Sequence, residues 1–162
     1  MTSRILVSIR VAAPPQRAFD VFTGEIGAWW INNDEFRFTP RSPGRLAFEP
    51  PDADGTGGRL VEHLKSGKVF EIGKLSVWEP AQRIVLSWRQ ATFGPDHDTE
   101  VEIRFEPVGD QTRVTVEHRG WERLPQEHAA RHGFPLGLFL TRHGQYWRHL
   151  LARLARQITD CS

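Results

Sequence analysis

Two ionisable residues fall on strand-like segments at positions where the surrounding pattern is apolar. Glu62 alternates with Leu60 and Leu64, and His118 has the same parity as Val116. A carboxylate and an imidazole on the inner face of a sheet can orient the polar group of a ligand or move a proton. The alternative is a structural role, because buried polar groups are ordinarily hydrogen-bonded to an indole N–H, an arginine or the backbone. Glu62 and His118 are therefore the candidate catalytic residues, and both interpretations stay open.

The chain contains six tryptophans, a large supply of flat apolar surface. Such side chains can line a pocket for a flat or hydrophobic ligand and offer an indole N–H as a polar contact. They can equally fill the core, as buried aromatic residues usually do. Trp88, on a predicted inner strand face, and Trp147, on the last predicted helix, are the strongest pocket candidates. The others are Trp29, Trp30, Trp78 and Trp121.

Metal and nucleophile motifs are incomplete in this sequence. His128 and His132 have the i, i+4 spacing of two ligands on one helical face, but Ala129 stands where a zinc protease motif places glutamate. The single cysteine, Cys161, excludes a disulfide within the chain and a cysteine-based zinc site. No glycine-rich phosphate loop followed by lysine and no nucleophile elbow occurs. The sequence therefore predicts no metal site and no cofactor.

The elements that would position these residues follow a simple order. Ile5–Val11 alternates in hydropathy and predicts a strand, which Pro14-Pro15 ends. Two short helices are predicted over 16–23 and 25–30, then six strands separated by turn residues, then a long amphipathic helix over 138–158. The six strands are predicted at 45–49, 59–64, 69–78, 84–90, 99–106 and 113–119, with one further helical turn at 125–131. This order predicts an α+β fold with the helices on one face of an antiparallel sheet.

In each of the last three predicted strands, residues at alternate positions point to opposite faces of the sheet. One face is apolar, and the other is mostly charged. The charged face, which includes Glu100, Glu102 and Arg104, is expected to lie in solvent. The apolar faces are expected to line the concave side of the sheet, opposite the long helix. They carry Ile84, Leu86, Trp88, Val101, Ile103, Phe105, Val114, Val116 and His118.

Length and charge favour a single domain and argue against a nucleic-acid-binding or membrane-spanning protein. The chain has 162 residues, a length typical of one domain, so residues 1–162 are expected to form a single domain. Its 21 basic and 20 acidic residues leave a formal net charge of +1, which provides no general attraction to nucleic acid or an anionic membrane. No apolar stretch approaches the ~20 residues that span a bilayer, and no signal-peptide core is present. A cytoplasmic monomer or homodimer is expected.

Seven segments, in sequence order, carry a resemblance to a known family. They are Val-Ala-Ala-Pro-Pro at 11–15, Ala-Phe-Asp-Val-Phe-Thr at 18–23, Trp29-Trp30, Gly57-Gly58-Arg59-Leu60-Val61-Glu62, Gly73 through Val77-Trp78-Glu79-Pro80, Arg83-Ile84-Val85-Leu86-Ser87-Trp88, and Thr112-Arg113-Val114 through His118-Arg119-Gly120-Trp121. Together they resemble Hsp90-ATPase-activator-like domains, which belong to the larger START, polyketide-cyclase and Bet-v-1-like superfamily. The resemblance covers nearly the whole chain, from about Ile5 to the final helix.

The resemblance implies a helix-grip fold, in which a curved antiparallel sheet of about six or seven strands wraps a long C-terminal helix. Two short helices follow the first strand, and a hydrophobic cavity lies between sheet and helix. The leading interpretation is a domain that binds a lipid, sterol or aromatic polyketide-like molecule without catalysis. The alternatives are a cyclase- or hydrolase-like enzyme on an aromatic polyketide-type substrate, with Glu62 and His118 as acid and base, and an interaction domain that either stimulates an Hsp90-like chaperone or partners a regulator. The residues expected to contact the ligand are Trp30, Glu62, Trp78, Leu86, Trp88, Ile103, Phe105, Val116, His118 and Trp147.

Overall fold

The computed structural model describes residues 4–31, 44–89, 99–121 and 136–160. The predicted helical turn at 125–131 lies outside these residues. The described helices are α1 (Pro15–Gly24), α2 (Ile26–Trp29) and α3 (Leu136–Asp160). The strands are β1 (Arg4–Val11), β2 (Arg45–Glu49), β3 (Arg59–His63), β4 (Val69–Glu79), β5 (Arg83–Trp88), β6 (Thr99–Val108) and β7 (Gln111–Arg119).

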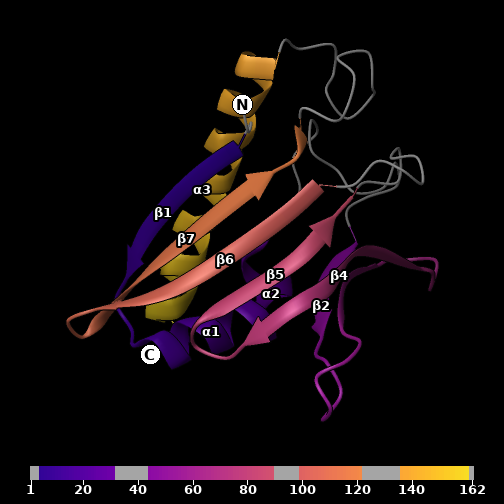
Figure 1. Ribbon diagram of the computed structural model, residues 1–162, viewed down its shortest axis with the longest axis horizontal. Coiled ribbons are helices and arrows are strands. Elements are labelled where there is room, and N and C mark those ends of the chain that lie inside the picture. The colour runs from indigo at the N-terminus through magenta and orange to yellow at the C-terminus, as the bar shows by residue number, and fades with distance from the viewer. Residues whose placement is uncertain (1–3, 32–43, 90–98, 122–135, 161–162) are drawn as a thin grey trace.

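The seven strands form one antiparallel sheet in the order β1-β7-β6-β5-β4-β3-β2. Each strand from β2 to β7 is paired with its neighbour in sequence. β1 is paired with β7 instead, so residues 4–11 meet residues 112–119. Figure 1 shows the sheet curving in front of α3, with α1 and α2 on the same side of the sheet as α3. The predicted α+β helix-grip architecture is confirmed, with seven strands.

The register brings apolar residues of neighbouring strands together on the inner face of the sheet. Ile84 lies opposite Ile103, which lies opposite Val116. Val116 lies in turn opposite Val7 on β1. These four side chains are at most 5% exposed, and directly opposite residues share a face of an antiparallel pair. The alternation of apolar residues therefore predicted the inner face of these strands correctly.

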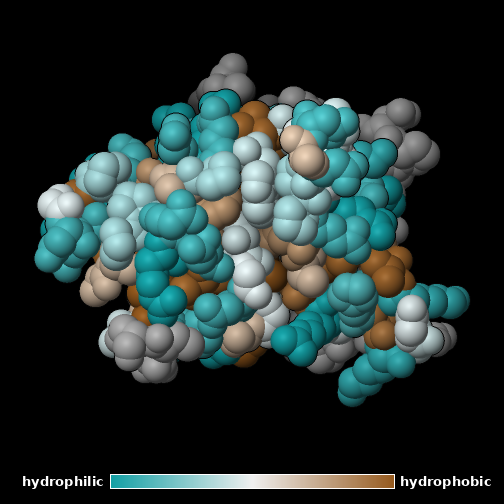
Figure 2. All heavy atoms as spheres, turned by 90° about the horizontal axis from the view of Figure 1, so that it is seen from below, coloured by the Kyte–Doolittle hydropathy of each residue, from teal (hydrophilic) through white to brown (hydrophobic). Residues whose placement is uncertain are grey.

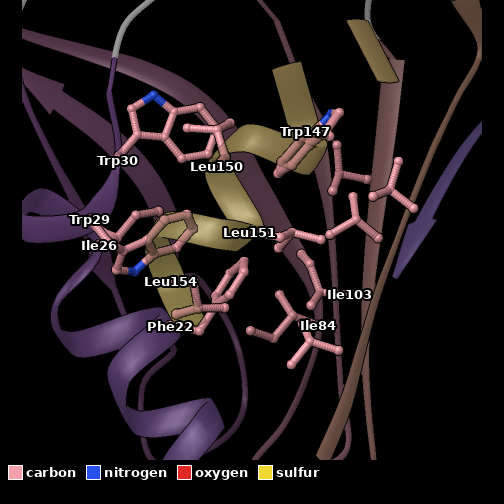
Figure 3. Packing of buried hydrophobic residues seen from close by; sticks show 14 of the residues in the cluster. Phe22, Ile26, Trp29, Trp30, Ile84, Ile103, Trp147, Leu150, Leu151 and Leu154 are labelled. Carbon is pink, nitrogen blue, oxygen red and sulfur yellow. The ribbon is translucent and has the colours of Figure 1, made fainter. Parts of the chain in front are cut away.

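α3 is amphipathic, and its apolar side fills the concave side of the sheet. Apolar residues recur every three or four positions along its 25 residues, which places them on one side of the helix. Figure 3 shows Leu150, Leu151 and Leu154 of α3 between the side chains of α1 and α2 and those of the strands. The helix begins and ends two residues beyond the predicted limits of 138 and 158. The α3 side chains that are at most 1% exposed are Trp147, Leu150, Leu151, Leu154 and Ile158.

The outer face of the sheet corrects one expectation, because Glu102 is only 8% exposed rather than solvated. Arg119 lies 3.1 Å from its carboxylate, Arg83 3.3 Å and Arg104 3.6 Å. These long side chains lie over the glutamate while their charged ends stay partly in water. Burial by itself would raise the pKa of Glu102, but the hydrogen bond from Arg119 and the three positive charges hold that pKa below its usual value. The alternation of residues along the strand placed Glu102 on the outer face correctly, but it did not show that arginine side chains cover this glutamate.

One face of the molecule is mainly hydrophilic (Figure 2). Figure 2 shows polar side chains over most of one face, with apolar atoms in smaller patches between them. The large exposed apolar side chains, Leu6, Ile31, Val69 and Leu138, are spread over different parts of the chain. Within the described ranges, no helix is both long enough and apolar enough to cross a membrane.

Candidate functional site

His118, near the end of β7, has hydrogen-bond partners at both ring nitrogens although it is 0% exposed. Trp147 Nε1 lies 3.3 Å from His118 Nδ1, and Thr99 Oγ1 lies 2.7 Å from His118 Nε2. An indole N–H can only donate, so Nδ1 accepts and the imidazole proton resides on Nε2. His118 therefore donates to Thr99, whose hydroxyl donates to the carbonyl oxygen of Trp88 at 2.9 Å. The direction of every hydrogen bond in this chain of groups follows from the indole.

The sheet register positions these groups. Thr99, the first residue of β6, lies opposite Trp88, the last residue of β5. Val101 lies opposite His118, which makes Thr99 and His118 diagonal neighbours on the same face of the sheet. Trp147 reaches them from the apolar side of α3. The network is thus assembled at the end of the molecule where β5 and β7 end and where β6 and α3 begin (Figure 1).

A second buried histidine, His143 of α3, lies beside the first. The ring centroids of His143 and His118 are 5.1 Å apart, and His143 is 3% exposed. Burial lowers the pKa of His143 to about 3. Burial, and then repulsion from His143, hold the pKa of His118 well below its usual value. Both imidazoles are therefore neutral at pH 7.

Sequence reasoning did not select His143 or Thr99, although a signal was present for each. His143 precedes Tyr146 by three residues and Trp147 by four, so it shares their side of the helix. Thr99 has the same parity as Val101 and therefore lies on the inner face of β6. A search for polar residues that fall in step with an apolar pattern would have found both.

Four tryptophans surround the histidines. The Trp121 ring lies 4.8 Å from His118, and the Trp88 ring lies 5.7 Å from it, between centroids. Trp88 and Trp147 are 5.5 Å apart, and Trp30 lies 5.5 Å from Trp147 and 5.7 Å from Trp88. These tilted and edge-to-face arrangements are the favourable ones for aromatic rings. The histidine–tryptophan cluster, as it is called below, comprises Trp30, Trp88, Thr99, His118, Trp121, His143, Tyr146 and Trp147.

Tyr146 lies beside Trp30 and His143, with ring centroids 6.2 Å from each. Its hydroxyl donates to the carbonyl oxygen of Ile31. Burial raises the pKa of Tyr146, and the charge of Glu62 raises it further, against an opposing effect of the nearby Trp30. Glu62 itself is 0% exposed, and its Oε2 accepts a hydrogen bond from the backbone N–H of Gly44 at 3.1 Å. The interior therefore holds a carboxylate, a phenol and two imidazoles.

The structure brings some of the predicted ligand-contacting residues together and separates others. Trp30, Trp88, His118 and Trp147 belong to the histidine–tryptophan cluster, and Glu62 is buried and affects Tyr146 through its charge. Leu86, Ile103 and Val116 are buried on the inner face of the sheet. Trp78 and Phe105 both contact Phe19 of α1, and these rings reach the cluster through Phe22 and Trp29.

The hydrogen bonds limit the chemistry available to the two candidate catalytic residues. His118 accepts at one nitrogen and donates at the other, so its ring has no lone pair left to take a proton from a substrate. Glu62 accepts a hydrogen bond from the backbone N–H of Gly44, and its charge raises the pKa of Tyr146. These internal hydrogen bonds suit a structural role for His118 better than proton transfer. Among the described residues, no three His, Cys, Asp or Glu side chains are grouped to hold a metal ion.

Two hollows lined by described residues lie away from the cluster. One of about 240 Å³ lies between α2 and α3 and is lined by Ala28, Trp29, Arg153, Arg156 and Gln157. The other, of about 430 Å³, lies beside β3 and β4 and is lined by Gly57, Gly58, Arg59, Glu71, Lys74 and Leu75.

Several solved structures share this fold. A protein of Mesorhizobium loti is 18% identical, with a TM-score of 0.66 and 98% of each chain covered. CalC from Micromonospora echinospora, described as a self-sacrificing resistance protein, is 24% identical, with a TM-score of 0.61, and the match covers 97% of this chain and 94% of CalC. DynU16, a putative protein in the dynemicin biosynthetic locus, is 20% identical, with a TM-score of 0.62, over 97% of this chain and 47% of DynU16. At these identities the likeness establishes the fold.

No curated protein matches the sequence. The family model for Activator of Hsp90 ATPase homolog 1-like protein matches residues 12–158, from the end of β1 to the last turn of α3. That range includes both histidines and all four tryptophans of the cluster. Because the match covers most of the chain and agrees with the fold, the chain belongs to the Activator of Hsp90 ATPase homolog 1-like protein family.

Proposed function

We propose that this domain binds a small hydrophobic molecule that carries at least one polar group, at the end of the sheet–helix interface where the histidine–tryptophan cluster lies. The observation that carries the proposal is the set of polar side chains buried among four tryptophans. Glu62 and His118 are 0% exposed, His143 is 3% exposed and Tyr146 is 6% exposed. Burying such groups costs free energy that apolar residues of similar size would not cost. The polar group of a bound ligand would be a reason for the domain to retain them.

The chemistry of the cluster defines the class of ligand. Tryptophan rings offer flat apolar surface, which suits a fused or aromatic ring system. Because the two imidazoles are neutral, they attract no anionic group, and Glu62 disfavours one. The ligand expected here is an uncharged ring compound with hydroxyl or carbonyl groups. The fold is shared with a self-sacrificing resistance protein and with a putative protein of the dynemicin biosynthetic locus, which is consistent with a small-molecule ligand.

A fluorescence titration tests the proposal with a panel of fatty acids, sterols, flavonoids and aromatic polyketides. Saturable quenching at micromolar concentration is expected for ring compounds, and heat of binding should give the same affinity. Trp147→Phe removes the indole donor to His118 and should weaken binding about tenfold, the effect of losing about 1.4 kcal/mol. Trp78→Phe is the matched control, because the ring contacts of Trp78 are with Phe19 and Phe48 rather than with the histidines, and it should leave the affinity within about twofold.

Two results would contradict the proposal. A flat response across the panel by both methods would show that the cluster binds no compound of this class. Equal weakening by Trp147→Phe and Trp78→Phe would place the ligand elsewhere or show a general loss of folding. Circular dichroism of both variants separates these last two cases.

A second candidate function is stimulation of an Hsp90-type ATPase. The observation in its favour is the family match over residues 12–158. A direct assay of a bacterial Hsp90 with and without the protein tests it. A rise in the ATPase rate that saturates with added protein supports the function, and an unchanged rate at saturating concentration removes it.

A further inference from the structure

The hollow between α2 and α3 has an unusual charge. Its lining residues are Ala28 and Trp29 of α2 and Arg153, Arg156 and Gln157 of α3, and they enclose about 240 Å³. Two of the five are therefore arginines, and none is acidic. We call this feature the α2–α3 hollow.

Neither arginine is neutralised by the described part of the chain. Arg153 donates from Nε to the carbonyl oxygen of Trp29 at 2.8 Å, which fixes the plane of its guanidinium and leaves its two terminal nitrogens for another partner. Neither Arg153 nor Arg156 makes an ion pair with a described residue. The arginines on the outer face of the sheet do have an acidic partner, because Arg83, Arg104 and Arg119 all form ion pairs with Glu102.

The residues that line the hollow supply no negative charge. α3 contains four arginines, and its one acidic residue is Asp160, with which it ends. Glu25 contacts the lining through Gln157, whose Nε2 donates a hydrogen bond to Glu25 Oε1 at 2.9 Å, but Glu25 does not itself line the hollow. A concave surface whose charged groups are all positive attracts and concentrates anions.

We propose that the α2–α3 hollow binds a small oxyanion, a phosphate or a carboxylate group. The planar guanidinium of Arg153, held by Trp29, presents parallel donors with the spacing of two oxygens of such a group. Arg156 supplies a second positive charge from one helical turn further along α3. The volume suits a small anion or the anionic end of a larger molecule, and is below that of a pocket for a whole drug-sized ligand. The site is separate from the histidine–tryptophan cluster and does not depend on the function proposed for it.

A nuclear magnetic resonance titration at constant ionic strength tests the site, with inorganic phosphate and acetate as the two probes and sodium chloride as the balance. Saturable shifts are expected at Ala28, Trp29, Arg153, Arg156 and Gln157, including the Nε–H signal of Arg153. Arg156→Gln should weaken binding of the preferred probe about tenfold, as expected for loss of one charged hydrogen-bond partner.

Arg148→Gln is the matched control. Arg148 is an exposed arginine on the same helix, outside the hollow, so its loss removes the same charge without touching the site. It should leave the affinity within about twofold, as screened charges at a distance do. Binding of either probe with this pattern supports the site and identifies the anion. Equal weakening by both variants, shifts spread along α3, or no saturation with either probe overturns it.

Discussion

At the scale of single residues, the indole N–H of Trp147 determines the direction of the hydrogen bonds around His118. Trp147 can only donate a hydrogen bond, so it determines the tautomer of His118 and through it the orientation of the Thr99 hydroxyl. Every polar atom in this short network has a defined role as donor or acceptor. Removal of one member therefore leaves a buried polar atom of its neighbour without a partner, which costs more than the hydrogen bond itself contributes.

Thr99→Val tests this network with nearly unchanged volume. It removes the acceptor for His118 Nε2–H and the donor to the Trp88 carbonyl, so the free energy of unfolding should fall by about 1–3 kcal/mol. Urea denaturation measures the change. Thr141→Val is the control, because that hydroxyl is exposed and bonds only within α3, and its effect should stay within about 0.5 kcal/mol. Equal effects of the two variants would contradict the proposed network.

The two buried histidines predict how stability depends on pH. The pKa of His143 is lowered to about 3 and that of His118 is well below its usual value, whereas histidines in the unfolded chain titrate near ~6.5. Below that pH the unfolded state binds more protons than the folded state, so stability is complete above it and decreases as the pH falls. Each histidine contributes a slope of about 1.4 kcal/mol per pH unit until its folded pKa is reached.

Urea denaturation between pH 7 and pH 4 measures this slope. His143→Phe removes one of the two groups and should make the slope about half as steep, whatever its effect on stability at pH 7. The imidazole C–H signals of His118 and His143 should show no titration midpoint near ~6.5 in the folded protein. Movement of both signals with a midpoint near ~6.5 would show that the rings are not held neutral by burial.

At the scale of elements, β4 is where the sheet changes direction. This 11-residue strand is paired with both β3 and β5, and the register shifts in each pairing. Such irregularities bend a strand and increase its local twist. Gly73 lies in this part of β4, where a Cβ atom would overlap the carbonyl oxygen of Ser87. The close approach of β4 to β5 therefore requires a residue without a side chain.

Gly73→Ala should consequently be severe. The added methyl group meets backbone rather than a movable side chain, so β4 and β5 must separate, at a cost of about 3 kcal/mol or more. Gly24→Ala is the control, because nothing lies within 4 Å of the place that a Cβ atom would take there, at the end of α1. Alanine at that position should change stability by at most about 1 kcal/mol, because alanine favours helix. Thermal unfolding of both proteins decides the question, and a mild effect at Gly73 would contradict the close approach.

At the scale of the whole molecule, one edge of the sheet joins the two ends of the chain. β1 is paired with β7 and contacts α3, so the first strand is held by the last strand and the last helix. The apolar side chains of the sheet, α1, α2 and α3 belong to one cluster. An element in this arrangement cannot leave without exposing apolar surface of several others, which makes independent unfolding of a part unfavourable.

We therefore expect the described domain to unfold in one cooperative transition. Far-ultraviolet circular dichroism reports the sheet and helices, and tryptophan fluorescence reports the cluster between them. Both should show the same midpoint in urea, and the calorimetric and van't Hoff enthalpies should agree. An earlier midpoint for fluorescence would show that the histidine–tryptophan cluster opens before the rest, and would contradict a single folding unit.

The sequence by itself determined the local pattern of this protein. Alternation with a period of two residues placed Val116 and His118 on the inner face of one strand, and a period of about 3.6 residues placed Trp147 and Leu151 on the buried side of α3. These periods follow from backbone geometry alone, so the strands, the long helix and the fold class were predictable. The seven family-like segments added the family, which the match over residues 12–158 confirms.

Only the tertiary structure decided which of these residues meet. Periodicity states the side to which a residue points, but not the distance between residues on separate elements, which depends on strand register and on how α3 lies across the sheet. For this reason His143 was not connected with His118, and Glu102 was expected in water. Arg153 and Trp29, far apart in sequence, form the α2–α3 hollow for the same reason: the chain brings them together only when α3 docks against α2.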